Sequence, residues 1–146
     1  MQKVEAALAN FNQGNGFNCS QSVLEVFSSD LGLDSEIAYK VSGLFGGGIG
    51  KTGETCGAVT GALMALGLKY GSTELEDKVG RQKAAAVAQQ FIEQFKIRNG
   101  SLKCKELLGI DISTDKGLEE IKEKRMAVSH CTALISDAVV IVEDLI

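Results

Sequence analysis

Four cysteines are spread singly along this chain, and their spacing decides which kinds of cysteine site the fold can build. They are Cys19, Cys56, Cys104 and Cys131. No two of them lie within three residues of each other, so the sequence excludes local zinc knuckles and CxxC redox motifs. If these thiols share any chemistry, the fold must bring them together from distant parts of the chain.

Apolar residues recur at helical spacing along the chain, and glycines rather than prolines separate the segments. An N-cap at Asn18 and a capping box from Thr73 to Glu76 mark two of the helix starts. The pattern predicts helices over about residues 2–13, 19–31, 35–45, 55–70, 73–99, 101–108 and 116–146, the last with a break near 127–130. We therefore predict an all-α fold in which residues 1–146 form a single-domain multi-helix bundle of about six or seven helices.

Charge and hydropathy exclude several classes of function. The chain of 146 residues has a formal net charge of −4, and its basic residues are dispersed among acidic ones. This pattern predicts no nucleic-acid partner. The start of the chain lacks the apolar core of a signal peptide, and the longest apolar run falls short of the roughly 20 residues of a spanning helix. We expect no membrane insertion and a cytoplasmic location, where permanent structural disulfides are unusual.

Three of the cysteines lie in the predicted first turns of helices. Cys19, Cys56 and Cys104 follow the candidate caps Asn18, Thr55 and Ser101. Free N–H groups and the helix dipole stabilise a thiolate in a first turn, so we expect lowered pKa values for these three thiols. In an up-and-down arrangement their helices start at one end of the bundle, and the long last segment returns Cys131 to that end. The preceding residue, His130, is the only histidine, but adjacent helical residues point in different directions.

Glycines flank Cys56 on both sides. Residues 46–52 read Gly-Gly-Gly-Ile-Gly-Lys-Thr, which resembles a phosphate-binding loop, but Phe45 stands where that motif requires glycine and no strand precedes it. We expect instead a flexible or tightly turned loop that delivers Cys56. After the cysteine, Gly57 and Gly61 indicate either close helix packing or space for an approaching sulfur, cofactor or substrate.

Residues 56–61 read Cys-Gly-Ala-Val-Thr-Gly, which is the motif CGAxxG. With one cysteine before this motif and two after it, the sequence resembles the C_GCAxxG_C_C family of redox-active proteins over about residues 15–140. The segment 18–22 and the glycines at 46–48 support the match. The resemblance implies a small, mostly bacterial or archaeal protein whose redox residues are Cys19, Cys56, Cys104 and Cys131.

Thiol–disulfide chemistry, as in a thiol–disulfide oxidoreductase, is the favoured hypothesis, and it requires no cofactor. One thiolate attacks an oxidised substrate, a second cysteine resolves the mixed disulfide, and the other pair relays electrons to an unidentified redox partner. Cys56 is the predicted nucleophile, because a helix start, a glycine-rich approach and small neighbours meet there. Spacing leaves all three pairings of the four cysteines open.

Two alternatives stay open at this point. In the first, Cys19, Cys56, Cys104 and Cys131 are metal ligands that hold an Fe–S cluster or zinc. In the second, the chain is a helical interaction or scaffold domain with inert buried cysteines, and it forms a homodimer through an exposed apolar stripe. Metal analysis tests the first alternative and thiol titration tests the second.

Overall fold

The computed structural model describes residues 2–14 and 16–146, and it confirms the all-α prediction. Asn15, predicted as part of the stop signal after the first helix, lies outside the described residues. Over the described ranges the elements are α1 (Gln2–Phe11), η1 (Asn12–Gly14), α2 (Cys19–Ser28), α3 (Ser35–Ser42), α4 (Gly57–Tyr70), α5 (Lys78–Asn99), α6 (Cys104–Leu108), α7 (Asp115–Glu123), η2 (Ala127–Cys131) and α8 (Thr132–Leu145). Within these ranges, the one β-type pairing is an isolated antiparallel bridge between Thr55 and Lys103.

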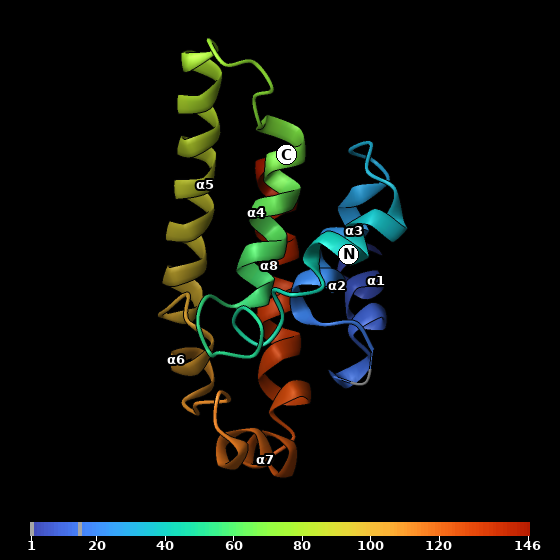
Figure 1. Ribbon diagram of the computed structural model, residues 1–146, viewed down its shortest axis with the longest axis vertical. Coiled ribbons are helices and arrows are strands. Elements are labelled where there is room, and N and C mark those ends of the chain that lie inside the picture. Colours follow the sequence, from blue (N-terminus) through green and yellow to red (C-terminus); the bar gives the residue numbers. More distant parts are fainter. Residues whose placement is uncertain (1, 15) are drawn as a thin grey trace.

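Three helices form the long axis of the molecule. Figure 1 shows α4, α5 and α8 running side by side, with α1–α3 packed against one flank and α6 and α7 at the lower end. The centre is filled by Leu24 from α2, by Phe91 and Phe95 from α5, and by Ile135 and Ile141 from α8, all of which are fully buried. Each such side chain stabilises the fold by roughly 1.5–3 kcal/mol.

Helix boundaries differ from the prediction mainly where a cap was misassigned. The predicted capping box from Thr73 is wrong, because α5 begins at Lys78. Its cap is Asp77, whose carboxylate accepts the N–H of Gly80 at 2.8 Å. Ser72, the residue before Thr73, donates its hydroxyl to the same aspartate at 3.0 Å. Helices α2 and α3 also end a few residues earlier than predicted, in irregular turns.

The predicted break in the last helical segment is confirmed. After α7 ends, Arg125 adopts a positive φ of 53°. The chain then forms the π-helical segment η2 and continues as α8, bent by 75° from α7. A π-helical turn is rare and is often found at functional sites. Cys131 is the last residue of this turn.

Helices α2 and α4 cross at the glycines of the CGAxxG motif. A Cβ atom at Gly61 would lie 2.5 Å from the carbonyl oxygen of Ser20, and one at Gly57 would lie 2.9 Å from the nitrogen of the same residue. These contacts favour the close-packing interpretation of the two glycines. The same approach places Cys19 against α4, because a Cβ at Gly57 would also lie 3.0 Å from Cys19 Cβ.

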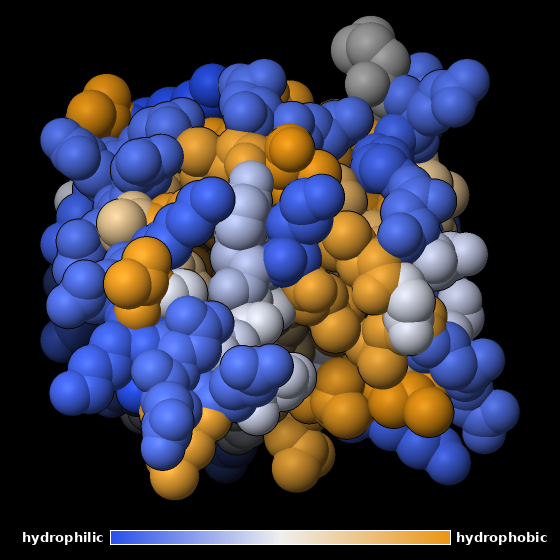
Figure 2. All heavy atoms as spheres, turned by 90° about the horizontal axis from the view of Figure 1, so that it is seen from above, coloured by the Kyte–Doolittle hydropathy of each residue, from blue (hydrophilic) through white to orange (hydrophobic). Residues whose placement is uncertain are grey.

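Hydrophobic side chains also reach the surface. Seen from above, orange side chains gather on one part of the face and are ringed by hydrophilic ones (Figure 2). No single helix in the described ranges is long and apolar enough to cross a membrane. Only α7 combined with residues 127–145 reaches the required length and composition, and the 75° bend separates these two parts.

Substituting Gly61 tests the helix crossing. Gly61→Ala is expected to lower the free energy of unfolding by about 1–3 kcal/mol, because the added methyl group forces α2 and α4 apart. The matched control is Gly67→Ala in the same helix, where nothing lies within 4 Å of the new Cβ. Helix propensity predicts that this control gains up to about 1 kcal/mol. Urea unfolding followed by circular dichroism measures both variants, and equal effects would contradict the close packing.

Candidate functional site

Backbone pairing between two loops brings Cys56 and Cys104 together. The N–H of Cys56 donates to the carbonyl oxygen of Leu102 at 2.7 Å, and the N–H of Cys104 donates to that of Glu54 at 2.6 Å. These bonds flank the isolated bridge described above. Alternate residues of paired extended segments point to the same side, so the two thiols are diagonal neighbours on one face. Both residues are buried, with 3% and 8% of their surface exposed.

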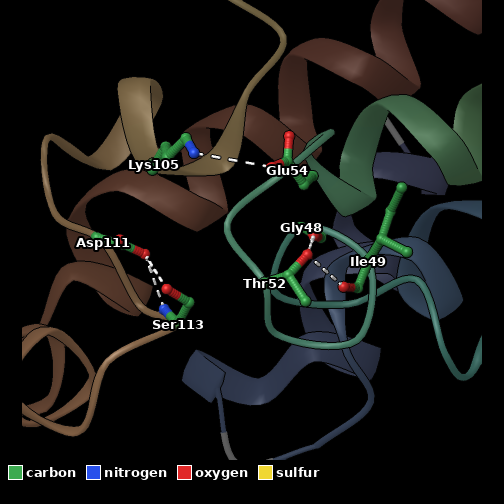
Figure 3. Close-up of polar contacts among 7 residues, drawn as sticks. All are labelled: Gly48, Ile49, Thr52, Glu54, Lys105, Asp111 and Ser113. Carbon is green, nitrogen blue, oxygen red and sulfur yellow. Dashed lines mark hydrogen bonds and ion pairs between the residues drawn. The ribbon is translucent and has the colours of Figure 1, made fainter.

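An ion pair lies across the same two loops. Figure 3 shows Lys105 reaching toward Glu54, with Nζ 3.7 Å from Oε1. The same view shows Asp111 accepting the backbone N–H of Ser113 at 3.0 Å in the turn that follows α6. Because the ion pair is half exposed to solvent, it contributes little to stability. The backbone hydrogen bonds therefore carry most of the alignment of the two cysteines.

The glycine-rich segment is a tight left-handed turn, as expected for a loop that delivers Cys56. Residues 47–51 all have φ between 60° and 73°. Positive φ is strained for a β-branched residue such as Ile49. Thr52 closes the turn by donating its hydroxyl to the carbonyl oxygen of Gly48 at 2.8 Å (Figure 3). A Cβ at Gly48 would lie 2.8 Å from Cys104 Cβ, so the bare loop backbone covers this cysteine.

Cys19 is the first residue of α2, and a confirmed cap fixes its position. The Asn18 side chain accepts the N–H of Gln21 at 2.9 Å, and the Gln21 side chain accepts the N–H of Asn18 at the same distance. Asn18 also donates to the carbonyl oxygen of Gly43 at 3.0 Å, which ties this helix start to the end of α3. The thiols of Cys19 and Cys131 lie close enough for a hydrogen bond between them to shift the pKa of both.

The fold gathers all four cysteines. Each of the six possible pairs of thiols interacts electrostatically, including the pairs that Cys131 forms with Cys56 and Cys104. The two environments nevertheless differ. Cys19 and Cys131 are half-buried and share a hydrogen bond, whereas Cys56 and Cys104 are buried. We call them the outer pair and the inner pair.

The inner pair overturns the prediction that helix starts lower the thiol pKa values. Burial raises the pKa of Cys56 to about 11, although the N–H groups of Ala58 and Val59 act in the opposite direction. Burial also raises the pKa of Cys104 to about 12, and the nearby charges of Cys56 and Cys131 add to the effect. Desolvation thus outweighs the helix-end field at both sites.

Cap positions also differ from the prediction at the inner pair. Cys56 is itself the N-cap of α4, so the cap is not Thr55, and its side chain forms no capping hydrogen bond. Helix α6 begins at Cys104 with Lys103 as its cap. Ser101, the predicted cap, instead accepts the N–H of Lys103 at 3.0 Å.

The outer pair holds the one thiol whose pKa is lowered. The hydrogen bond from Cys19 lowers the pKa of Cys131 and exceeds the opposing effect of burial. The pKa of Cys19 is raised, first by the same hydrogen bond and then by burial. The two thiols titrate as a coupled pair, and the hydrogen bond between them favours the negative charge on Cys131.

His130 contacts its neighbour Ser129. Its exposed ring is 2.7 Å from the Ser129 hydroxyl through Nδ1. Among the residues that the structure describes, no group of three or more His, Cys, Asp or Glu side chains is arranged to hold a metal ion. Sequence reasoning missed the pairing of residues 54–56 with 102–104, because backbone hydrogen bonds leave no side-chain signature.

Comparison with known proteins gives a family match for most of the chain. Residues 17–145 match a family model described as "Putative redox-active protein (C_GCAxxG_C_C)". The chain belongs to the C_GCAxxG_C_C family. In that name the glycine precedes the cysteine, whereas this chain has Cys56 first and Gly57 second. No curated protein and no solved structure matches the chain.

The four thiols of this C_GCAxxG_C_C protein should differ in their rates of alkylation. Near neutral pH, Cys131 is expected to react with iodoacetamide first, because the Cys19 hydrogen bond lowers its pKa, and the inner pair last, because burial raises theirs. Cys19→Ala removes the donor and should shift the alkylation profile of Cys131 to higher pH. Cys19→Ser keeps a hydroxyl donor and serves as the control. Peptide mass spectrometry measures each site, and faster labelling of Cys56 than of Cys131 would contradict this order.

Proposed function

We propose that this protein carries out thiol–disulfide exchange with the outer pair as the reacting cysteines. The hydrogen bond between the thiols of Cys19 and Cys131 is the observation that carries the proposal. It supplies a nucleophile of lowered pKa with a resolving thiol already in contact. The half-buried position of both residues allows a substrate disulfide to approach, which the deeper inner pair does not offer.

The exchange proceeds in two balanced steps. The Cys131 thiolate attacks one sulfur of the substrate disulfide, forms a mixed disulfide and releases the first substrate thiolate. Cys19 then loses its proton to solvent and attacks Cys131 Sγ, which releases the second substrate thiolate. The substrate gains two electrons, and the outer pair is left as a disulfide.

The inner pair is suited to act as a second dithiol that reduces the outer pair. Cys56 and Cys104 interact electrostatically with Cys131, and their burial protects them from direct attack by a substrate. In this role the inner pair reduces the outer disulfide and becomes a disulfide itself, so two electrons pass inward. This assignment replaces Cys56 with Cys131 as the proposed nucleophile.

Single cysteine variants test these roles. With the chromogenic aromatic disulfide DTNB, Cys131→Ser is expected to slow the first exchange step by at least about tenfold, because the only thiol with a lowered pKa is lost. Cys56→Ser should retain the rate of this step. Cys19→Ser should accumulate a mixed disulfide on Cys131, which mass spectrometry detects as one added thiol adduct. Full activity of Cys131→Ser would refute the assignment.

A further inference from the structure

A pocket of about 390 Å³ lies beside the glycine-rich segment. Leu44, Ile112 and Leu118 form its apolar walls, and the backbone of the glycines at 46 and 47 forms another side. Lys51 is the only residue with a formal charge in the lining. The pocket therefore combines a mostly apolar interior with one cation.

The walls of this pocket also contact the thiol site. Asn18 lines the pocket and directly precedes Cys19. Ile112 belongs to the small buried cluster that contains Cys104. A molecule in this pocket would therefore lie beside the segments that carry Cys19 and Cys104.

Unpaired backbone donors adjoin the pocket. The N–H groups of Gly46, Gly47 and Gly48 have no hydrogen-bond acceptor within residues 2–14 and 16–146. Gly46 and Gly48 are buried, and a buried donor without an acceptor destabilises the fold. Successive N–H groups in such a turn form a concavity that binds anions. These donors call for an oxygen ligand, from water or from a bound anion.

Lys51, in the same left-handed turn, supplies the positive charge at the pocket. Lys51 has a φ of 63°, a conformation that non-glycine residues rarely adopt and that recurs at ligand-binding positions. It forms no ion pair with any described residue. The turn thus gathers, beside an apolar pocket, one free cation and the free N–H groups of two lining residues, Gly46 and Gly47.

We propose that this pocket binds a small organic carboxylate with an apolar chain, and that the substrate of the outer pair is a disulfide of this class. The carboxylate meets Lys51 and the free N–H groups, and the chain lies against Leu44, Ile112 and Leu118. This inference rests on the proposed thiol–disulfide exchange for the substrate part only. Bound there, the disulfide takes two electrons from Cys19 and Cys131, gains two protons from the thiols and solvent, and leaves as a dithiol.

Binding of octanoate tests the pocket without any redox step. Isothermal titration calorimetry of the reduced protein should show one site for octanoate, and Lys51→Gln should weaken it about two- to fivefold through loss of an exposed charge contact. Lys69→Gln, in the last turn of α4, removes an equal charge away from the pocket and should leave the affinity unchanged. Absence of binding, with only water at the free N–H groups, would overturn the proposal.

A second variant pair separates charge from shape. Leu44 is 80% exposed at the pocket, so its replacement should not disturb folding. Leu44→Glu places a carboxylate beside the bound anion and should weaken octanoate binding about fivefold, whereas the neutral Leu44→Gln should lose less. Equal losses in the two variants would contradict an anionic ligand.

Lipoate, a cyclic disulfide with a carboxylate and an apolar chain, connects the pocket to the chemistry. In single-turnover reactions of the reduced protein, Leu44→Glu should raise the lipoate concentration at half-maximal rate about fivefold while leaving the limiting rate unchanged. If octanoate binds as expected but lipoate is not reduced by wild-type protein that still reacts with DTNB, the substrate class is wrong and the exchange chemistry stands. If neither disulfide reacts, the proposed function fails while the binding site stands.

Discussion

Two backbone hydrogen bonds, from Cys56 to Leu102 and from Cys104 to Glu54, align the centre of this molecule. They join the segment before α4 to the segment before α6, and they place two cysteines from distant parts of the chain on one face. The left-handed turn at residues 47–51 covers Cys104 with the bare backbone of Gly48, and only glycine permits such a close approach. The start of α2 then packs against Gly57 and Gly61, and this crossing adds Cys19 to the group.

The helices, and the break that precedes Cys131, could be predicted from sequence because they depend on local signals. Apolar spacing predicted the helical segments, Asn18 formed the expected cap, and the predicted break near residues 127–130 falls in the π-helical turn. The cap of α5 was missed because threonine and aspartate both cap helices well, and the sequence pattern alone does not choose between Thr73 and Asp77. The pairing of the loops could not be predicted, since any residue type can supply its backbone.

Helix position predicted thiol reactivity poorly, and burial explains the failure. A first-turn position stabilises a thiolate only when the thiol keeps enough contact with water. Cys56 has the helix start and the donors of Ala58 and Val59, yet its burial raises its pKa to about 11. Cys131, in a π-helical turn without free helix-end donors of its own, has a lowered pKa because Cys19 donates to it. A contact between two cysteines far apart in sequence therefore decides which thiol is the better nucleophile.

The contact between Cys19 and Cys131 also has a topological consequence. A covalent link between them would close a ring of about 110 residues, and chain-entropy models assign a ring of that size between 4 and 5 kcal/mol, roughly, of resistance to unfolding. Only α1 with its following turn and α8 would remain as free tails outside the ring. Oxidation of this pair would therefore raise the thermal stability of the protein as well as change its reactivity.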